Sequence, residues 1–140
     1  LFATGTGLAP FLAIIRDPEA YERFEHVVLV HGVRQVNDLV YREYLENELP
    51  QHEYLGEVIR EKFLYYPSVT RESFEHQGRI TELLESGRIC DDLGLPPLDP
   101  EQDRAMICGS MAMLMDERGF RISANQGTPG DYVIERAFVG

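Results

Sequence analysis

Short apolar runs alternate with amphipathic stretches along the chain, and this alternation constrains the fold more than any other feature. The runs predicted to be strands are Leu1–Ala3, His26–His31, Lys62–Thr70, Ala105–Cys108 and Tyr132–Val139. Helical patterns lie between them, at Pro10–Ile15, Asp38–Leu49, Ile80–Leu84 and Arg88–Leu93 and from Met111 onward. Such crossovers connect parallel strands. The sequence therefore predicts a doubly wound α/β domain, with a mostly parallel five-stranded sheet in the order 3-2-1-4-5, flanked by helices and with a truncated first strand.

The composition is that of one acidic globular domain. The 140 residues are 44% hydrophobic, and 24 acidic against 13 basic residues give a formal net charge of −11. Nucleic acid and anionic membranes require a positive surface, so neither is expected as a partner. Cys90 and Cys108 lack metal-ligand spacing and indicate neither a zinc site nor a disulfide framework, which is typical of a reducing cytoplasm. The oligomeric state cannot be read from the sequence.

A glycine turn follows the first predicted strand, where ligands of such sheets bind. It reads Gly5-Thr6-Gly7-Leu8-Ala9-Pro10. Glycines let the backbone approach a pyrophosphate, and the helix that follows offers free N–H groups and a positive dipole end. The turn lacks the third glycine of a dinucleotide fingerprint, so an ordinary strand-to-helix turn explains it equally well.

Arginines follow the second and third predicted strands. Arg34 follows the second, Arg71 follows the third, and Arg79 stands eight residues beyond Arg71. Guanidinium groups bind a phosphate through charge-assisted hydrogen bonds, which favours NADP over NAD. The alternative is that Arg71 pairs with Glu72 or Glu75 and that Arg79 caps a solvated helix.

A cysteine and a glycine, Cys108-Gly109, follow the fourth predicted strand. A small thiol beside a glycine could contact a flat ring, although a lone cysteine at a strand end is on its own more typical of a small core residue. No histidine stands near it in the sequence to support a nucleophilic role. The four histidines of the chain are interpreted as structural.

Together these segments resemble, in order and spacing, the NADP-binding half of bacterial ferredoxin (flavodoxin):NADP⁺ reductases. The resemblance lies in Leu1–Phe11, Val30–Arg34, Tyr66–Glu72, Gln77–Arg79, Arg104–Ser110 and Tyr132–Val139. It implies that residues 1–140 form an NADP(H)-binding domain, preceded in the family by an FAD-binding β-barrel. It also implies hydride transfer between nicotinamide and FAD, and single-electron transfer between FAD and a ferredoxin or flavodoxin. The barrel and its flavin motif are absent here, so the chain alone is not expected to hold FAD tightly or to be active.

The resemblance also implies roles for individual residues. Gly5, Thr6, Gly7, Ala9 and Pro10 would shape the pyrophosphate and ribose site. Arg34, Thr70, Arg71 and Arg79 would hold the adenosine and its 2′-phosphate, with Asp103 nearby. Cys108, Gly109, Ser110 and Met111 would place the nicotinamide, and Ala137, Phe138 and Val139 would lie near the flavin. Cys108, Thr6 and Phe138 are the residues expected at the reaction itself, where they orient the reactants and exclude water and do not act as acids or bases.

The charge of the chain limits how it would meet an electron carrier. Ferredoxins and flavodoxins are acidic, so a domain of net charge −11 is not expected to supply their main docking face. That face would belong to the barrel or to the seam between domains. Two alternatives stay open: a nucleotide-binding module that is silent without its flavin partner, and a reductase with another acceptor, as in flavohaemoglobin or oxygenase reductases.

Overall fold

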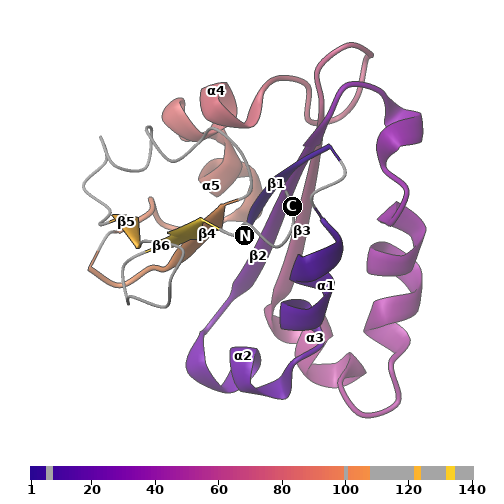
Figure 1. Cartoon of the computed structure of the whole chain (residues 1–140), viewed down its shortest axis with the longest axis vertical. Coiled ribbons are helices and arrows are strands. Elements are labelled where there is room, and N and C mark those ends of the chain that lie inside the picture. The colour runs from indigo at the N-terminus through magenta and orange to yellow at the C-terminus, as the bar shows by residue number, and fades with distance from the viewer. Residues whose placement is uncertain (6–7, 100, 108–121, 124–131, 135–140) are drawn as a thin grey trace.

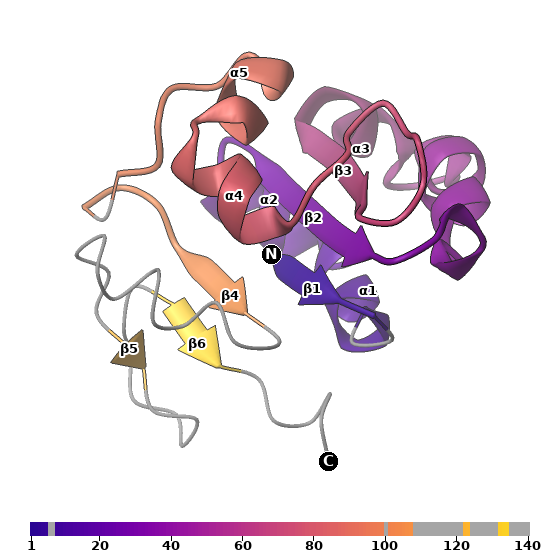
Figure 2. The same ribbon diagram turned by 90° about the horizontal axis from the view of Figure 1, so that it is seen from above.

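A six-stranded sheet in the order β3-β2-β1-β4-β6-β5 forms the centre of the molecule (Figures 1 and 2). The computed structural model describes residues 1–5, 8–99, 101–107, 122–123 and 132–134, and gives only the backbone for residues 9–10, 122–123 and 132–134. The strands are β1 (Phe2–Thr4), β2 (Val27–Val33), β3 (Phe63–Val69), β4 (Ala105–Ile107), β5 (Ile122–Ser123) and β6 (Tyr132–Ile134). Every pairing between these described strands is parallel.

The predicted order of strands is confirmed. The five predicted strands correspond to β1, β2, β3, β4 and β6, which lie in the order 3-2-1-4-5. The additional strand β5 pairs with β6 at the edge of the sheet, and at two residues it is too short to leave an alternating pattern in the sequence. The predicted extensions of the fourth strand to Cys108 and of the fifth to Val139 lie outside the described residues, as does the helix expected from Met111.

Strand β2 lies between β1 and β3. It pairs with β1 on one side, and all seven of its residues pair in register with β3 on the other. Its β-branched and leucine side chains are mostly buried, as expected for a strand covered on both faces. Pro67 lies within β3, where its missing N–H is tolerated because β3 is an edge strand.

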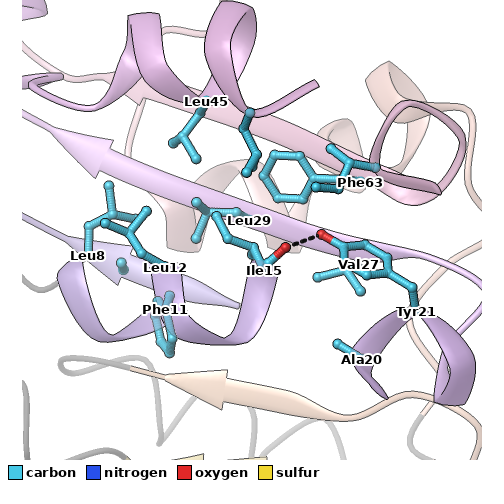
Figure 3. Close-up of a cluster of buried hydrophobic side chains, with 13 residues drawn as sticks. Leu8, Phe11, Leu12, Ile15, Ala20, Tyr21, Val27, Leu29, Leu45 and Phe63 are labelled. Atoms are coloured by element: carbon cyan, nitrogen blue, oxygen red, sulfur yellow. Dashed lines mark hydrogen bonds between the residues drawn. The ribbon is translucent and has the colours of Figure 1, made fainter. Parts of the chain in front are cut away.

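One face of the sheet is covered by α1 (Ala9–Ile15), α2 (Pro18–Arg23) and α3 (Gly56–Lys62), together with the short helices η2 (Tyr44–Glu48) and η3 (Leu49–Gln51). Figure 3 shows the cluster of buried side chains between these helices and β2, including the hydrogen bond from the Tyr21 hydroxyl to the Ile15 carbonyl. The prediction of a helix over Pro10–Ile15 is confirmed by α1. Neither α2 nor α3 is among the predicted helices.

The opposite face is covered by α4 (Ile80–Glu85) and α5 (Arg88–Leu93), which confirm the two helices predicted there. Ile80, Leu83, Leu84 and Ile89 from these helices pack in one cluster with Phe2, Val30, Tyr66, Ala105 and Ile107 from four strands. In the described part of the chain, no helix combines the length and apolar character needed to cross a membrane.

The single helix predicted over Asp38–Leu49 is confirmed only in part. Val36–Asp38 form a separate 3-10 turn, η1, and a continuous helical run begins at Arg42, becomes the π-helix η2 (Tyr44–Glu48) and ends in the 3-10 turn η3 (Leu49–Gln51). Leu39 packs with Val33 and Val69 near the carboxyl ends of the strands, whereas Leu45 packs in the cluster that Figure 3 shows. The apolar positions thus serve two separate clusters, and Pro50 interrupts the helical hydrogen bonds because it has no N–H.

Candidate functional site

Three arginines converge on an open pocket at the carboxyl ends of β2 and β3. The pocket has a volume of about 460 Å³ and is lined by Arg34, Thr70, Arg71, Gly78, Arg79 and Glu82. The four residues predicted to hold the adenosine and its 2′-phosphate therefore line one pocket. Three arginines and one glutamate line the pocket, which gives a local excess of positive charge in a chain of net charge −11. A phosphate group fits this environment, since its oxygens accept charge-assisted hydrogen bonds.

The segment between Arg71 and Arg79 folds back onto the end of β3. The Val69 N–H donates to the His76 carbonyl at 3.0 Å, and the Gly78 N–H donates to the Val69 carbonyl at 3.0 Å. Gly78 has a φ of 139°, a conformation that favours glycine. This closed loop brings two arginines that are eight positions apart to the same pocket.

Backbone pairing between the ends of β2 and β3 continues past both strands. The Thr70 N–H donates to the Val33 carbonyl at 3.0 Å, and the Arg71 N–H donates to the Arg34 carbonyl at 2.9 Å. These two bonds hold the first residues after each strand next to each other. Arg34 and Arg71 therefore enter the pocket from adjacent backbone positions.

The alternative in which Arg71 pairs with a neighbouring glutamate is wrong. The Glu72 carboxylate accepts the Val36 N–H at 3.1 Å, and the Glu75 carboxylate pairs with Arg42 at 3.5 Å. Among the residues that the structure describes, no ion pair involves any of the three pocket arginines. Their guanidinium groups are thus available to an anionic ligand.

Arg79 occupies the N-cap position of α4, as the alternative interpretation has it, but its guanidinium cannot accept a hydrogen bond from the helix N–H groups, and the residue also lines the pocket. The next residue, Ile80, packs directly over Gly32 of β2. A Cβ atom on Gly32 would lie 2.8 Å from Ile80 Cδ1 and 2.9 Å from Ile80 Cγ1, closer than side-chain atoms tolerate. The absence of a side chain at Gly32 lets α4 start against the sheet, and this contact positions Arg79 at the pocket.

The glycine turn lies at the same edge of the sheet, after β1. Gly5 is exposed and has a φ of 58°, in the left-handed region that glycine adopts without strain. Its N–H donates to the Gly32 carbonyl at 3.0 Å, one residue past the end of β1. Helix α1 begins at Ala9, with Pro10 in its first turn. This arrangement of a strand end, a glycine and a helix start is compatible with a pyrophosphate site.

His31 was interpreted as structural, and it contacts the first residue of the glycine turn. Its side chain is 1% exposed, and its Nε2 lies 2.7 Å from the Gly5 carbonyl oxygen. Because a carbonyl only accepts, Nε2 carries the proton, and Nδ1 has no hydrogen-bond partner among the described residues. Burial lowers the pKa of His31 below its usual value, and the bond to Gly5 opposes this shift. The one available signal was a polar residue inside a buried apolar strand.

The other predicted site residues are not brought together by the described part of the structure. Asp103 is not among the residues that line the arginine pocket, and its carboxylate accepts the Asp99 N–H at 2.8 Å. The predicted residues that lie outside the described ranges are Thr6, Gly7, Cys108, Gly109, Ser110, Met111, Ala137, Phe138 and Val139. The nicotinamide side of the predicted site therefore stays a prediction.

Comparison with known proteins agrees with this geometry. Residues 1–118 match the family described as oxidoreductase NAD-binding domain. A ferredoxin–NADP reductase of Azotobacter vinelandii is 59% identical over 145 residues, which cover 99% of this chain and 56% of that protein. A ferredoxin–NADP reductase A of Sorangium cellulosum is 60% identical over 146 residues, which cover all of this chain and 52% of that protein. The chain thus spans about half the length of these relatives.

A solved structure has the same fold. The crystal structure of a ferredoxin NADP⁺ reductase from Neisseria gonorrhoeae with bound FAD and NADP aligns with a TM-score of 0.75 and 32% sequence identity. The alignment covers 96% of this chain and 53% of that one. The likeness therefore extends over nearly all of the chain.

Proposed function

Because the chain belongs to the oxidoreductase NAD-binding domain family, we propose that it is the NADP(H)-binding half of a ferredoxin or flavodoxin–NADP⁺ reductase. The chain covers about half of relatives that carry this name, and the solved neighbour holds FAD and NADP. The nicotinamide and the flavin would supply the hydride chemistry of such a reductase. The residues of this chain would bind and orient the nucleotide and exclude water from it.

The observation that carries the proposal is the pocket lined by Arg34, Arg71 and Arg79. NADP differs from NAD by a phosphate on the adenosine ribose, and a phosphomonoester dianion fits three guanidinium groups that have no ion pair among the described residues. Thr70, which carries a hydroxyl, lines the same pocket. The glycine turn after β1 would receive the pyrophosphate at the same edge of the sheet.

The flavin and the electron carrier would bind mainly to another part of the protein. We propose that an FAD-binding domain supplies the flavin site, and that a ferredoxin or flavodoxin docks on that domain or on its seam with this one. The net charge of −11 supports this arrangement, since an acidic carrier is repelled by an acidic surface.

The proposal is tested by the effect of nucleotides on the thermal stability and calorimetric binding of the 140-residue chain. A ligand that binds only the folded state at a hundred times its Kd stabilises it by about 2.7 kcal/mol. We expect NADP⁺ and adenosine 2′-monophosphate to bind, NAD⁺ to bind more weakly than NADP⁺, and FAD to have no effect. Equal binding of NADP⁺ and NAD⁺ would contradict the assignment of the arginine pocket.

A further inference from the structure

The loop between β3 and α4 contains two glutamates, and both carboxylates are bound outside the arginine pocket. The Val36 N–H donates to the Glu72 carboxylate at 3.1 Å, and the Glu75 carboxylate lies 3.5 Å from Arg42 Nη2. Neither glutamate is among the residues that line the pocket, although the same loop supplies Arg71 to it. The negative charges of the loop are thus separated from its phosphate-binding cation.

Arg42 contacts this loop at two consecutive residues. Its guanidinium carbon lies 4.9 Å from the centre of the Phe74 ring, within the range of a cation–π interaction, and its Nη2 pairs with Glu75. The Phe74 ring packs against the cluster that contains Val33 and Val69, at the ends of β2 and β3. The aromatic ring therefore fixes where the guanidinium lies, and the guanidinium fixes where the Glu75 carboxylate lies.

We propose that Arg42 is a positioning residue for recognition of the 2′-phosphate, because it holds the Glu75 carboxylate away from Arg71. This inference rests on the proposed function. A carboxylate and a phosphate compete for one guanidinium, since both accept its paired N–H groups. Arg71 lies four positions before Glu75 in the same loop, so it is a cation that this carboxylate can pair with when Arg42 is absent.

Stability is a poor explanation for the contact between Arg42 and Glu75. The two side chains are 34% and 60% exposed, and exposed ion pairs contribute little to the free energy of unfolding. Arg42 also has a second carboxylate partner, Glu46, whose Oε1 lies 3.2 Å from Arg42 Nε. The charge of Arg42 is therefore neutralised without Glu75. The consequence of the additional contact is the position of the Glu75 carboxylate.

A second cation near Glu75 is already paired. Arg88 Nη2 donates to the backbone carbonyl of Glu75 at 3.5 Å, while Arg88 Nε lies 3.4 Å from the carboxylate of Asp92. Three arginines and one glutamate line the pocket, and a Glu75 carboxylate paired with Arg71 would make this three against two. Such a change acts on a phosphate dianion, so it should weaken the binding of NADP⁺ and leave the binding of NAD⁺ nearly unchanged.

Three variants test the inference. Arg42→Gln removes the cation that holds Glu75. Arg42→Gln with Glu75→Gln also removes the released carboxylate, and Arg42→Gln with Glu46→Gln is the matched control. Both double variants have the net charge of the unaltered chain, and each loses one carboxylate that contacts Arg42, but only Glu75 belongs to the loop that supplies Arg71. Calorimetry at low salt gives the affinities for NADP⁺ and NAD⁺, and urea unfolding shows whether each variant is folded.

We expect Arg42→Gln to bind NADP⁺ about fivefold more weakly than the unaltered chain, because the Glu75 carboxylate competes with the phosphate. Its affinity for NAD⁺ should change by less than about twofold. The double variant with Glu75→Gln should bind NADP⁺ within about twofold of the unaltered chain, whereas the double variant with Glu46→Gln should stay about fivefold weaker. If Arg42→Gln does not fold, Arg42→Met, which keeps an unbranched side chain over Phe74, takes its place with the same expectations.

Four results would overturn the inference. The first is a folded Arg42 variant that binds NADP⁺ as tightly as the unaltered chain, and the second is an equal loss of NADP⁺ and NAD⁺ binding. The third is equal rescue by Glu46→Gln and Glu75→Gln, which would indicate a general effect of charge. The fourth is no rescue by Glu75→Gln, which would indicate that Arg42 acts only through its packing on Phe74. Failure of the unaltered chain to bind NADP⁺ is a distinct outcome, which would refute the proposed function and with it this inference.

Discussion

Replacing Arg71 and Arg79 together by glutamine tests which group of the nucleotide the pocket recognises. Glutamine keeps a polar side chain but removes the charge and the planar fork that binds phosphate. A matched control is the same Arg→Gln change at Arg23 and at Arg16, which keeps the change in net charge equal. Arg23 lies in the last turn of α2, which leads into the amino end of β2, at the other end of the sheet from the pocket (Figure 1).

The size of the effect follows from the composition of the pocket. A hydrogen bond to a charged group contributes about 1.5 to 3 kcal/mol. We take the lower value because the three guanidinium groups are exposed, where water and salt weaken charge interactions. Losing two such bonds then costs about 3 kcal/mol, which corresponds to about a hundredfold lower affinity for NADP⁺. NAD⁺ lacks the 2′-phosphate, so its affinity should change by less than about threefold.

Isothermal titration calorimetry with NADP⁺ and NAD⁺ at low and high salt gives the four affinities needed for each protein. The unaltered chain and the control should prefer NADP⁺, and this preference should weaken as salt screens the pocket. The double variant should show almost no preference at either salt concentration. The reasoning fails if the double variant still binds NADP⁺ within about threefold of the unaltered chain, or if NAD⁺ affinity falls by the same factor as NADP⁺ affinity.

Two further predictions concern β2. Gly32→Ala should lower the free energy of unfolding in urea by about 1 to 3 kcal/mol, because the added Cβ overpacks against Ile80. It should also weaken NADP⁺ binding, because the displaced α4 moves Arg79. Unchanged stability would contradict this packing argument. Because the pKa of His31 is lower in the folded chain than in the unfolded chain, the unfolded chain binds more protons at acidic pH. The free energy of unfolding should therefore fall as the pH drops below about 6.5. His31→Gln should remove that part of the pH dependence, and an identical pH profile for both proteins would count against it.

The arginine pocket was predictable because it depends on a topological rule. In a parallel sheet the carboxyl ends of neighbouring strands share one edge, so residues that follow β2 and β3 must lie near each other. This rule brings Arg34 and Arg71 together without any knowledge of the loops. The position of Arg79 was less certain, because it depends on how the loop before α4 closes against Val69. Those backbone hydrogen bonds leave no pattern in the sequence.

The helices and the His31 contact that were not predicted depend on tertiary packing, which the sequence does not show. The segment over Asp38–Leu49 has helical spacing, but its apolar side chains pack into two clusters, and only the folded arrangement shows that one straight helix does not serve both. Helices of six or seven residues carry little periodicity, so α1, α4 and α5 were found whereas α2 and α3, of the same length, were missed. The partner of His31 is a backbone carbonyl 26 residues away, and a carbonyl has no residue type to recognise.

The segment His31–Arg34 explains how the two halves of the proposed site are held in one geometry. Its first residue binds the Gly5 carbonyl, and the carbonyl of its second accepts the Gly5 N–H, so the pyrophosphate turn is attached to β2 twice. The missing side chain of Gly32 admits Ile80 on the opposite face and so sets where Arg79 enters the pocket. The last residue binds the Arg71 N–H through its carbonyl and lines the phosphate pocket with its side chain. Strand β2 thus holds both the start of the glycine turn and Arg34, and the loop before α4 adds Arg79 to the same pocket.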